Sequence, residues 1–138
     1  MVTEDDVVEA TARALREAGW TITQQLTTKA SGVDVIAERE GQRLLIEAKG
    51  YTSASTTSAR YGKPFNPNQL WDHTAKAIYK ALAVVSDGHD LAGIALPDDP
   101  RTVAVVAAVQ PALDQLGVHV IWVDHQRALT VEIPSPLR

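Results

Sequence analysis

The chain has 138 residues, 45% of them hydrophobic, a formal net charge of −4 and no cysteine, which excludes disulfides and thiolate metal sites. This length suits one domain with a substantial core, so we expect residues 1–138 to form a single domain. No apolar run approaches the length of a membrane span and the first residues lack the basic start of a signal peptide, so we expect a cytoplasmic protein with no membrane partner.

The first predicted helix spans residues 3–18. Thr3 is its N-cap, because a threonine followed three positions later by an acidic residue is a typical helix start, and Gly19 ends it. The apolar residues that share its buried face are Val8, Ala12, Leu15 and Ala18. A strand over residues 20–26 follows, and residues 27–32 form a polar connection.

Two apolar strands interrupted by charged residues come next, on either side of a polar turn. Their sequences are SGVDVIAE (residues 31–38) and LLIEAKG (residues 44–50). A two-residue hairpin turn at Glu40-Gly41 places Asp34 directly opposite Glu47, with Cβ atoms about 4.5–5.5 Å apart. Lys49 shares the face of Glu47, because side chains alternate along a strand. A register shifted by one residue would put the two carboxylates on opposite faces.

This pair of carboxylates is the strongest chemical signal in the chain. Two carboxylates at that spacing repel each other unless a cation lies between them, and burying unpaired charge is costly. Mg²⁺ suits such a place, because it binds one or two carboxylates and keeps several waters. Lys49 could reach a metal-bound water or a phosphate there. The alternative is a surface ion-pair cluster, which the apolar neighbours of Asp34 and Glu47 disfavour.

A loop rich in serine and threonine occupies residues 51–66 and leaves directly from the lysine strand, and loops of this length are usually functional or mobile. Asn66 then starts a second helix as N-cap, with Pro67 at the first helical position and Gln69 as the capping-box residue. This helix ends near residues 86–89. One of its polar faces carries Gln69, His73, Lys76 and Lys80.

The remaining elements alternate between strands and helices. An apolar strand covers residues 91–96, and a helical stretch begins at Asp99, where Pro111 should kink or split it. A fifth strand covers residues 118–123, and residues 129–133 are a candidate for a short terminal strand. The order is helix, three strands, helix, strand, helix, strand. It predicts an α/β fold with a mixed sheet of about five strands flanked by helices.

The charge is unevenly distributed, although its net value does not favour nucleic-acid binding. Residues 47–80 contain five basic and two acidic side chains, so this region is positive within an acidic protein. A basic surface beside carboxylates is typical of a phosphate-facing region, and chance clustering explains the counts about as well. The expected nucleic-acid contacts are Arg60, Tyr61, Lys63, Gln69, His73 and Lys76.

We expect core or half-buried packing for Trp20, Trp71 and Trp122.

The sequence of elements around Gly32-x-Asp34 and Glu47-x-Lys49 resembles the PD-(D/E)XK nuclease superfamily, which has the restriction-endonuclease-like fold. The resemblance covers most of the chain, including the tail segments Ile94-Ala-Leu-Pro97, Leu116-Gly-Val118 and Val120-Ile-Trp-Val123. It implies the order αβββαβαβ. One departure is the missing proline of the motif, because Val33 precedes Asp34.

The resemblance also implies a function: metal-dependent hydrolysis of DNA phosphodiester bonds, with Mg²⁺ as cofactor and Mn²⁺ as a substitute. Asp34 and Glu47 would be metal ligands, and the carbonyl of Ala48 would be a further ligand. Lys49 would orient or activate the attacking water. Many members have an acidic residue in the first helix, for which Glu9 is the best-placed match.

Asp5 and Asp6 are alternatives to Glu9 as the acidic residue of the first helix. The nuclease is also one of three hypotheses for the function of the chain. A second hypothesis is a non-catalytic nucleic-acid-binding or assembly module on the same fold. A third is an unrelated small α/β protein with a structural acidic pair. The intact set of Asp34, Glu47 and Lys49 favours the nuclease. A nuclease of this size would act as a homodimer or within a larger complex, because cutting two strands needs two sites.

Overall fold

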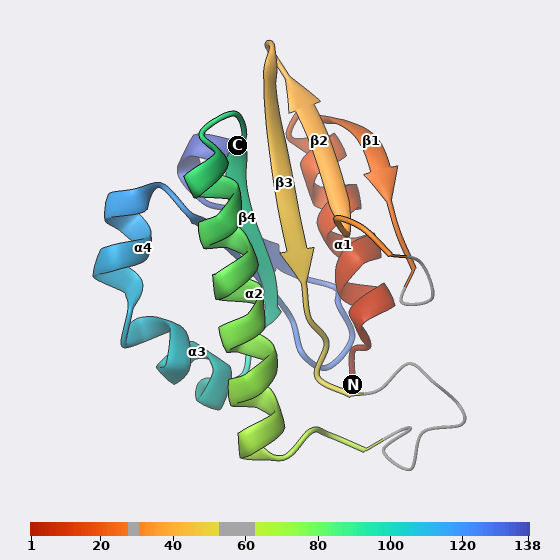
Figure 1. Ribbon diagram of the computed structural model, residues 1–138. Coiled ribbons are helices and arrows are strands. Elements are labelled where there is room, and N and C mark those ends of the chain that lie inside the picture. Colours follow the sequence, from red (N-terminus) through yellow and green to blue (C-terminus); the bar gives the residue numbers. More distant parts are fainter. Residues whose placement is uncertain (28–30, 53–62) are drawn as a thin grey trace.

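A mixed six-stranded sheet lies between helices in the computed structural model, which describes residues 1–27, 31–52 and 63–138 (Figure 1). The strands are β1 (Thr21–Gln25), β2 (Val35–Arg39), β3 (Gln42–Ala48), β4 (Leu91–Pro97), β5 (His119–Val123) and β6 (Val131–Glu132). The helices are α1 (Glu4–Glu17), α2 (Pro67–Asp87), α3 (Pro100–Ala107), α4 (Gln110–Leu116) and the 3₁₀ helix η1 (Ser135–Leu137).

The strands lie in the sheet in chain order. β1, β2 and β3 are antiparallel neighbours, β3, β4 and β5 are parallel, and β6 is antiparallel to β5. The predicted α/β class and mixed sheet are confirmed. The expected number of about five strands is corrected to six in the described part of the chain, because residues 131–132 pair with β5. The stretch after Asp99 forms two helices, α3 and α4, with Pro111 in the first turn of α4.

The β2–β3 hairpin has the predicted register. Its pairs include Val35 with Ile46 and Arg39 with Gln42. Glu40 and Gly41 have φ values of 52° and 77°, the left-handed values that a tight hairpin turn requires at both central positions. This turn lies at the far end of the sheet from the chain's N-terminus (Figure 1). The paired residues of this ladder end at Val35 and Ile46, and Asp34 is the residue directly before β2.

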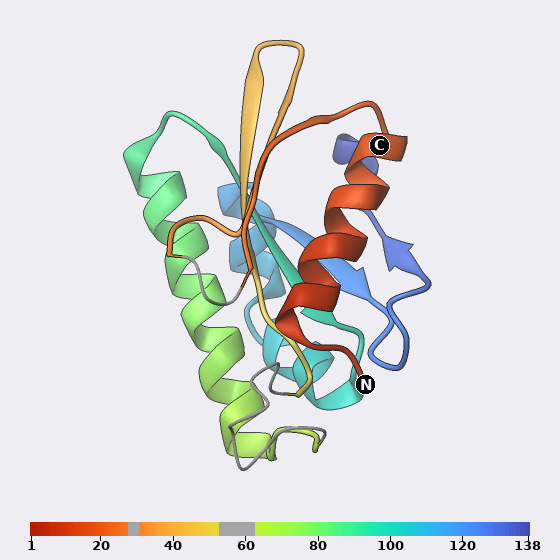
Figure 2. The same ribbon diagram turned by 90° about the vertical axis from the view of Figure 1, so that its right-hand side faces the viewer.

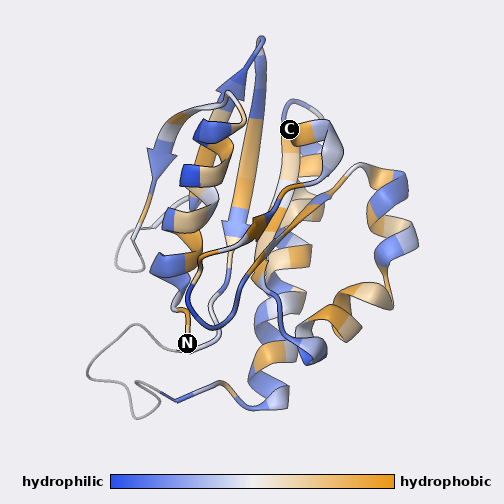
Figure 3. Ribbon diagram, turned by 180° about the vertical axis from the view of Figure 1, so that it is seen from behind, coloured by the Kyte–Doolittle hydropathy of each residue, from blue (hydrophilic) through white to orange (hydrophobic). Residues whose placement is uncertain are grey.

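Two buried clusters cover the two faces of the sheet. On one face, α1 packs against the alternating residues of β3 that point toward it, Leu44, Ile46 and Ala48. On the other face, α2 packs against β3 and β4, and α3 packs beside it (Figures 1 and 2). Figure 3 shows hydrophobic residues along the central strands and hydrophilic ones at the hairpin tip. Because Glu47 alternates with the α1-facing residues, it lies on the α2 face.

The expected helix starts are confirmed by reciprocal capping bonds. Thr3 and Asp6 form a capping box at α1, and Asn66 and Gln69 form another at α2. None of the helices within the described ranges combines the length and apolarity that crossing a lipid bilayer requires.

The exposure of Trp71 contradicts one prediction about the packing of the tryptophans. Trp20 is buried and its indole Nε1 donates to the Leu137 carbonyl at 2.7 Å, and Trp122 is half-buried, as predicted. Trp71 is 57% exposed, so the prediction that it packs in the core is wrong. Its neighbour Leu70 occupies the buried stripe of α2 and turns Trp71 outward.

The chain leaving β3 passes directly over the N-terminus of α1. The backbone N–H groups of Tyr51 and Thr52 donate to the Val2 carbonyl at 2.9 and 3.2 Å. A Cβ atom at Gly50 would lie 2.4 Å from the backbone nitrogen of Glu4 and 2.6 Å from the carbonyl carbon of Thr3. Only glycine fits this crossing, which holds the start of α1 against the end of β3.

We predict that Gly50→Ala lowers the free energy of unfolding by about 3 kcal/mol, because the clash is with backbone atoms that cannot rotate away. Urea denaturation measures this change. Gly88→Ala is the control: its Cβ meets nothing within 4 Å, and only the left-handed φ of 76° opposes it, at about 1 kcal/mol. Equal losses of unfolding free energy in the two variants would contradict the inference that Gly50 is the more tightly constrained glycine.

Candidate functional site

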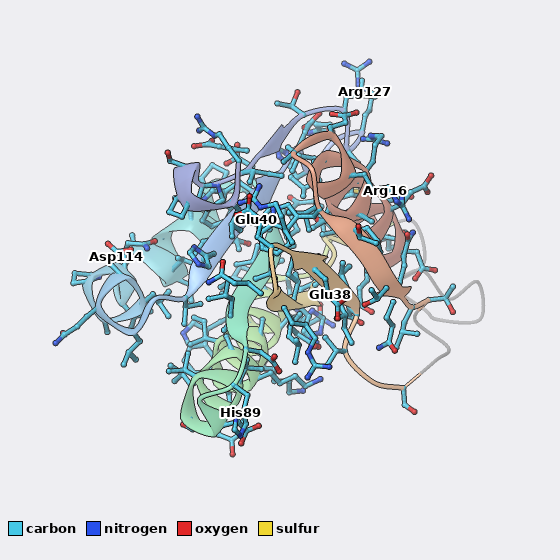
Figure 4. The ribbon with its side chains drawn as sticks, turned by 90° about the horizontal axis from the view of Figure 1, so that it is seen from above. Arg16, Glu38, Glu40, His89, Asp114 and Arg127 are labelled. Atoms are coloured by element: carbon cyan, nitrogen blue, oxygen red, sulfur yellow. The ribbon has the colours of Figure 1, made fainter. Side chains whose placement is uncertain are left out.

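The candidate site lies at the end of β3, beside the start of α1 and one side of α2 (Figure 1). Asp34, Glu47 and Lys49 meet there, as the hairpin register predicted. Figure 4 looks onto the opposite end of the sheet, where the labelled Glu38 and Glu40 lie at the β2–β3 turn. A pocket of about 1000 Å³ opens at that opposite end, far from the three residues.

Asp34 is buried and held by the backbone of the neighbouring strand. It is 8% exposed, and its Oδ2 accepts a hydrogen bond of 2.8 Å from the amide N–H of Ala48. Burial raises the pKa of Asp34, the Ala48 hydrogen bond lowers it, and the nearby charge of Glu47 raises it again. Among the described residues this bond occupies only Oδ2, which leaves Oδ1 available to a ligand.

Glu47 is paired with two lysines. Its Oε1 lies 2.9 Å from Nζ of Lys80 and 3.8 Å from Nζ of Lys49. The Glu47 side chain is 11% exposed and that of Lys80 57%, so Lys80 reaches in from the surface of α2. The hydrogen bond that Lys80 donates to Glu47 raises the pKa of Lys80. Two cations therefore balance the negative charge of Glu47 and Asp34.

The α1 carboxylate at the site is Glu4. Its pKa is raised to about 7, first by burial and then by the charge of Asp34, while the charge of Lys49 opposes the shift. Glu9, which the sequence favoured, is exposed, and it is Glu4 whose charge is coupled to Asp34, Glu47 and Lys49. The expectation for Glu9 is therefore corrected. Glu9 lies more than one helical turn beyond the crossing at Gly50, whereas Glu4 lies at it.

The carboxylate oxygens of Asp34 and Glu47 are the type of donor atom that suits a hard divalent cation, because Mg²⁺ prefers oxygen ligands. With respect to the residues that the structure describes, Asp34 keeps Oδ1 available and Glu47 keeps Oε2 outside its ion pairs. Within the described ranges, however, no group of three or more histidine, aspartate or glutamate side chains is arranged to hold a metal ion. A cation between Asp34 and Glu47 would have to take over the place of the lysine ammonium groups.

The other predicted contacts are distributed unevenly around this cluster. The pKa of His73 is lowered by burial and then by the charges of Lys49 and Lys76, and its ring meets that of Phe65 edge-on with centroids 4.5 Å apart. The structure thus brings His73 near Lys49. The side chain of Gln69 serves the capping box, and Lys76 and Lys63 are exposed. The expected contacts Arg60 and Tyr61 lie outside the described residues.

Sequence reasoning missed two residues of this site, Glu4 and Lys80. Glu4 follows the N-cap directly, and only the crossing of Gly50 over Thr3 shows that this helix start meets β3. Lys80 did have a signal, because it lies one turn after Lys76 on the polar face of α2.

Comparison with models of protein families finds no match, and no curated protein matches the chain. One similar solved structure is the FdxN element excision controlling factor protein from Anabaena variabilis. The match covers 93% of this chain and 96% of that one, with 20% sequence identity and a TM-score of 0.47. A similarity at this level assigns no function, so the chemistry must be argued from the residues.

We predict that the Glu4 carboxyl of the metal-free protein titrates with a midpoint of about 7, measured by NMR of the side-chain carboxyl carbon. Asp34→Asn should lower this pKa by removing a neighbouring negative charge, and Glu9→Gln should leave it unchanged. Because the folded pKa lies above the unfolded value, the contribution of Glu4 to stability is full below pH 4.5 and is lost as the pH rises through 7. A midpoint near 4.5 would contradict this arrangement.

Proposed function

We propose that this chain is a metal-dependent DNA endonuclease with a restriction-endonuclease-like fold of the PD-(D/E)XK kind. The observation that carries the proposal is the meeting of Asp34, Glu47 and Lys49 at the end of one hairpin in the register that their spacing predicted. A mixed sheet with α1 on one face and α2 on the other is consistent with that fold.

In this proposal Asp34 and Glu47 hold Mg²⁺ or Mn²⁺, the Ala48 carbonyl is a further ligand, and Glu4 is a carboxyl group coupled to the site by its charge. A cation held by these residues would supply a water of lowered pKa and a positive charge beside the phosphate. The Ala48 amide fixes the orientation of Asp34 through its hydrogen bond. Lys49 is 17% exposed on its side chain, which suits a fixed positive charge beside the attacked phosphate.

DNA is the proposed substrate because cationic side chains surround the acidic cluster. Lys80 reaches Glu47 from α2, Lys76 lies one turn earlier on the same helix, and His73 lies near Lys49 and Lys76. Lys63 is exposed, and its carbonyl accepts a hydrogen bond from the hydroxyl of Thr52, which lies just beyond β3. Lysines contact phosphates without reading sequence, so this set implies backbone binding. A homodimer or a larger complex would supply the second site for cutting two strands, and the cytoplasm is the proposed location.

A non-catalytic nucleic-acid-binding module is the second candidate. It is favoured by the neutralisation of Glu47 by Lys80 and Lys49, together with the lack of a three-ligand group in the described residues. In such a module the acidic cluster would be a structural ion-pair network, and the lysines would still contact phosphates.

We predict that the purified protein cleaves DNA with Mg²⁺ or Mn²⁺ and not with EDTA. Lys49→Ala and Asp34→Asn should each reduce cleavage by about 100-fold or more, because each removes a charge that acts on the reacting phosphate. Plasmid and linear DNA are incubated with each variant, and products are separated on gels. Glu9→Gln is the matched acidic control and should cleave normally. Binding without cleavage would favour the second candidate, and cleavage that persists in both variants would indicate a contaminant.

We predict that Lys80→Met strengthens Mg²⁺ and Mn²⁺ binding by about two- to fivefold, measured by isothermal titration calorimetry. Lys80 competes with a cation for Glu47, and an ion pair of this exposure is worth roughly 0.2–1 kcal/mol. Lys76→Met removes an exposed lysine one turn earlier and should change the affinity less. Weaker metal binding in Lys80→Met would contradict a cation that replaces the ammonium at Glu47.

A further inference from the structure

The outer face of α2 carries two large exposed aromatic side chains. Trp71 is 57% exposed and Tyr79 is 74% exposed. They are eight residues apart, which is about 12 Å along the helix and about 80° around it, and both line one pocket. Ala75 lies midway between them and is too small to cover either ring. Exposing two large rings on one face of a helix is unusual for a surface without a binding role.

Two adjoining hollows connect these rings to the candidate site. A pocket of about 320 Å³ is lined by Trp71, Asp72, Ala75, Lys76, Tyr79 and Lys80. A second pocket, of about 380 Å³, also has Tyr79 and Lys80 in its wall and extends to Glu47. The rest of its wall is largely apolar, with Val33, Leu45 and Val84 among its residues. Tyr79 and Lys80 thus lie between the aromatic face and the acidic cluster.

Two kinds of occupant suit exposed rings, and the charges distinguish them. Lys76 and Lys80 flank the rings, against the single carboxylate of Asp72. In a symmetric contact between two copies the same patch lies on both sides, so two faces with more lysines than carboxylates would repel each other. Single-stranded nucleic acid needs aromatic rings for its bases and cations for its phosphates, which is the combination present here. Duplex DNA keeps its base faces stacked and cannot use the rings.

We propose that this face of α2 binds unpaired nucleotides, with bases stacked on Trp71 and Tyr79 and phosphates beside Lys76 and Lys80. The face leads into the acidic cluster, so the substrate would be DNA with a single-stranded segment next to the attacked phosphate. This substrate class rests on the proposed nuclease function. The spacing of the rings corresponds to about three to four stacked nucleotides at a rise of 3.4 Å.

The test measures binding of a fluorescein-labelled 20-nucleotide single strand and its duplex by anisotropy, with EDTA present so that cleavage does not interfere. Trp71→Ala and Tyr79→Ala should each weaken single-strand binding by about fivefold to 100-fold and duplex binding by less than twofold, since a stacked base is worth roughly 1–3 kcal/mol. Trp71→Phe and Tyr79→Phe should retain most of the affinity. Leu129→Ala is the control, because Leu129 is 69% exposed on another part of the surface.

Unchanged single-strand binding in both alanine variants would overturn the proposal. So would a fall in sedimentation mass on Trp71→Ala, because the face would then be an interface between two copies. The cleavage assay separates this result from the fate of the nuclease. Metal-dependent cleavage with ring-independent binding overturns only the stacking face. Ring-dependent binding without cleavage in any metal supports the stacking face and overturns the nuclease.

Discussion

The close passage of Gly50 over the backbone of Thr3 and Glu4 is the contact on which the candidate site depends. It brings together the end of β3 and the start of α1, two elements that are neighbours only in space. The backbone bonds from Tyr51 and Thr52 to Val2 strengthen the same crossing. Because no side chain intervenes, Glu4 is held within electrostatic reach of Asp34 and Lys49. A looser crossing would leave the hairpin intact and remove the third carboxylate.

The carboxylates at this crossing are balanced by neighbouring lysines and by a backbone amide. Three carboxylates are coupled there, and burial, with a smaller part from the charges of neighbouring carboxylates, raises the pKa of Glu4 and of Asp34. Two lysines and one backbone amide offset part of that cost. Such a balance is consistent with two uses. A static network would keep the lysines in place, whereas a cation-binding site would exchange an ammonium group for the metal.

The sequence predicted the hairpin part of this arrangement because that part is local. Counting outward from Glu40-Gly41 sets the register, and alternation then puts Glu47 and Lys49 on one face. Residue spacing could not place Glu4 at the site. Its position depends on the crossing of two chain segments, which the pattern of polar and apolar residues does not predict. The packing prediction for Trp71 failed for a different reason. Trp71 adjoins Leu70 at the edge of the buried stripe of α2, where helical spacing alone does not distinguish a buried position from an exposed one.

Lys80 connects the two proposals, because it contacts the acidic cluster and also lines both hollows beside the aromatic face. Its ammonium is 2.9 Å from Glu47, yet 57% of its side chain is exposed. A phosphate bound on the α2 face would compete with Glu47 for this ammonium. Each phosphate–Lys80 contact would then release a carboxylate oxygen of Glu47 toward a cation. In the proposed enzyme, binding of unpaired DNA and binding of the metal would therefore favour each other through one side chain, and the lysine that blocks the cation in the free protein would be the one that admits it when DNA is bound.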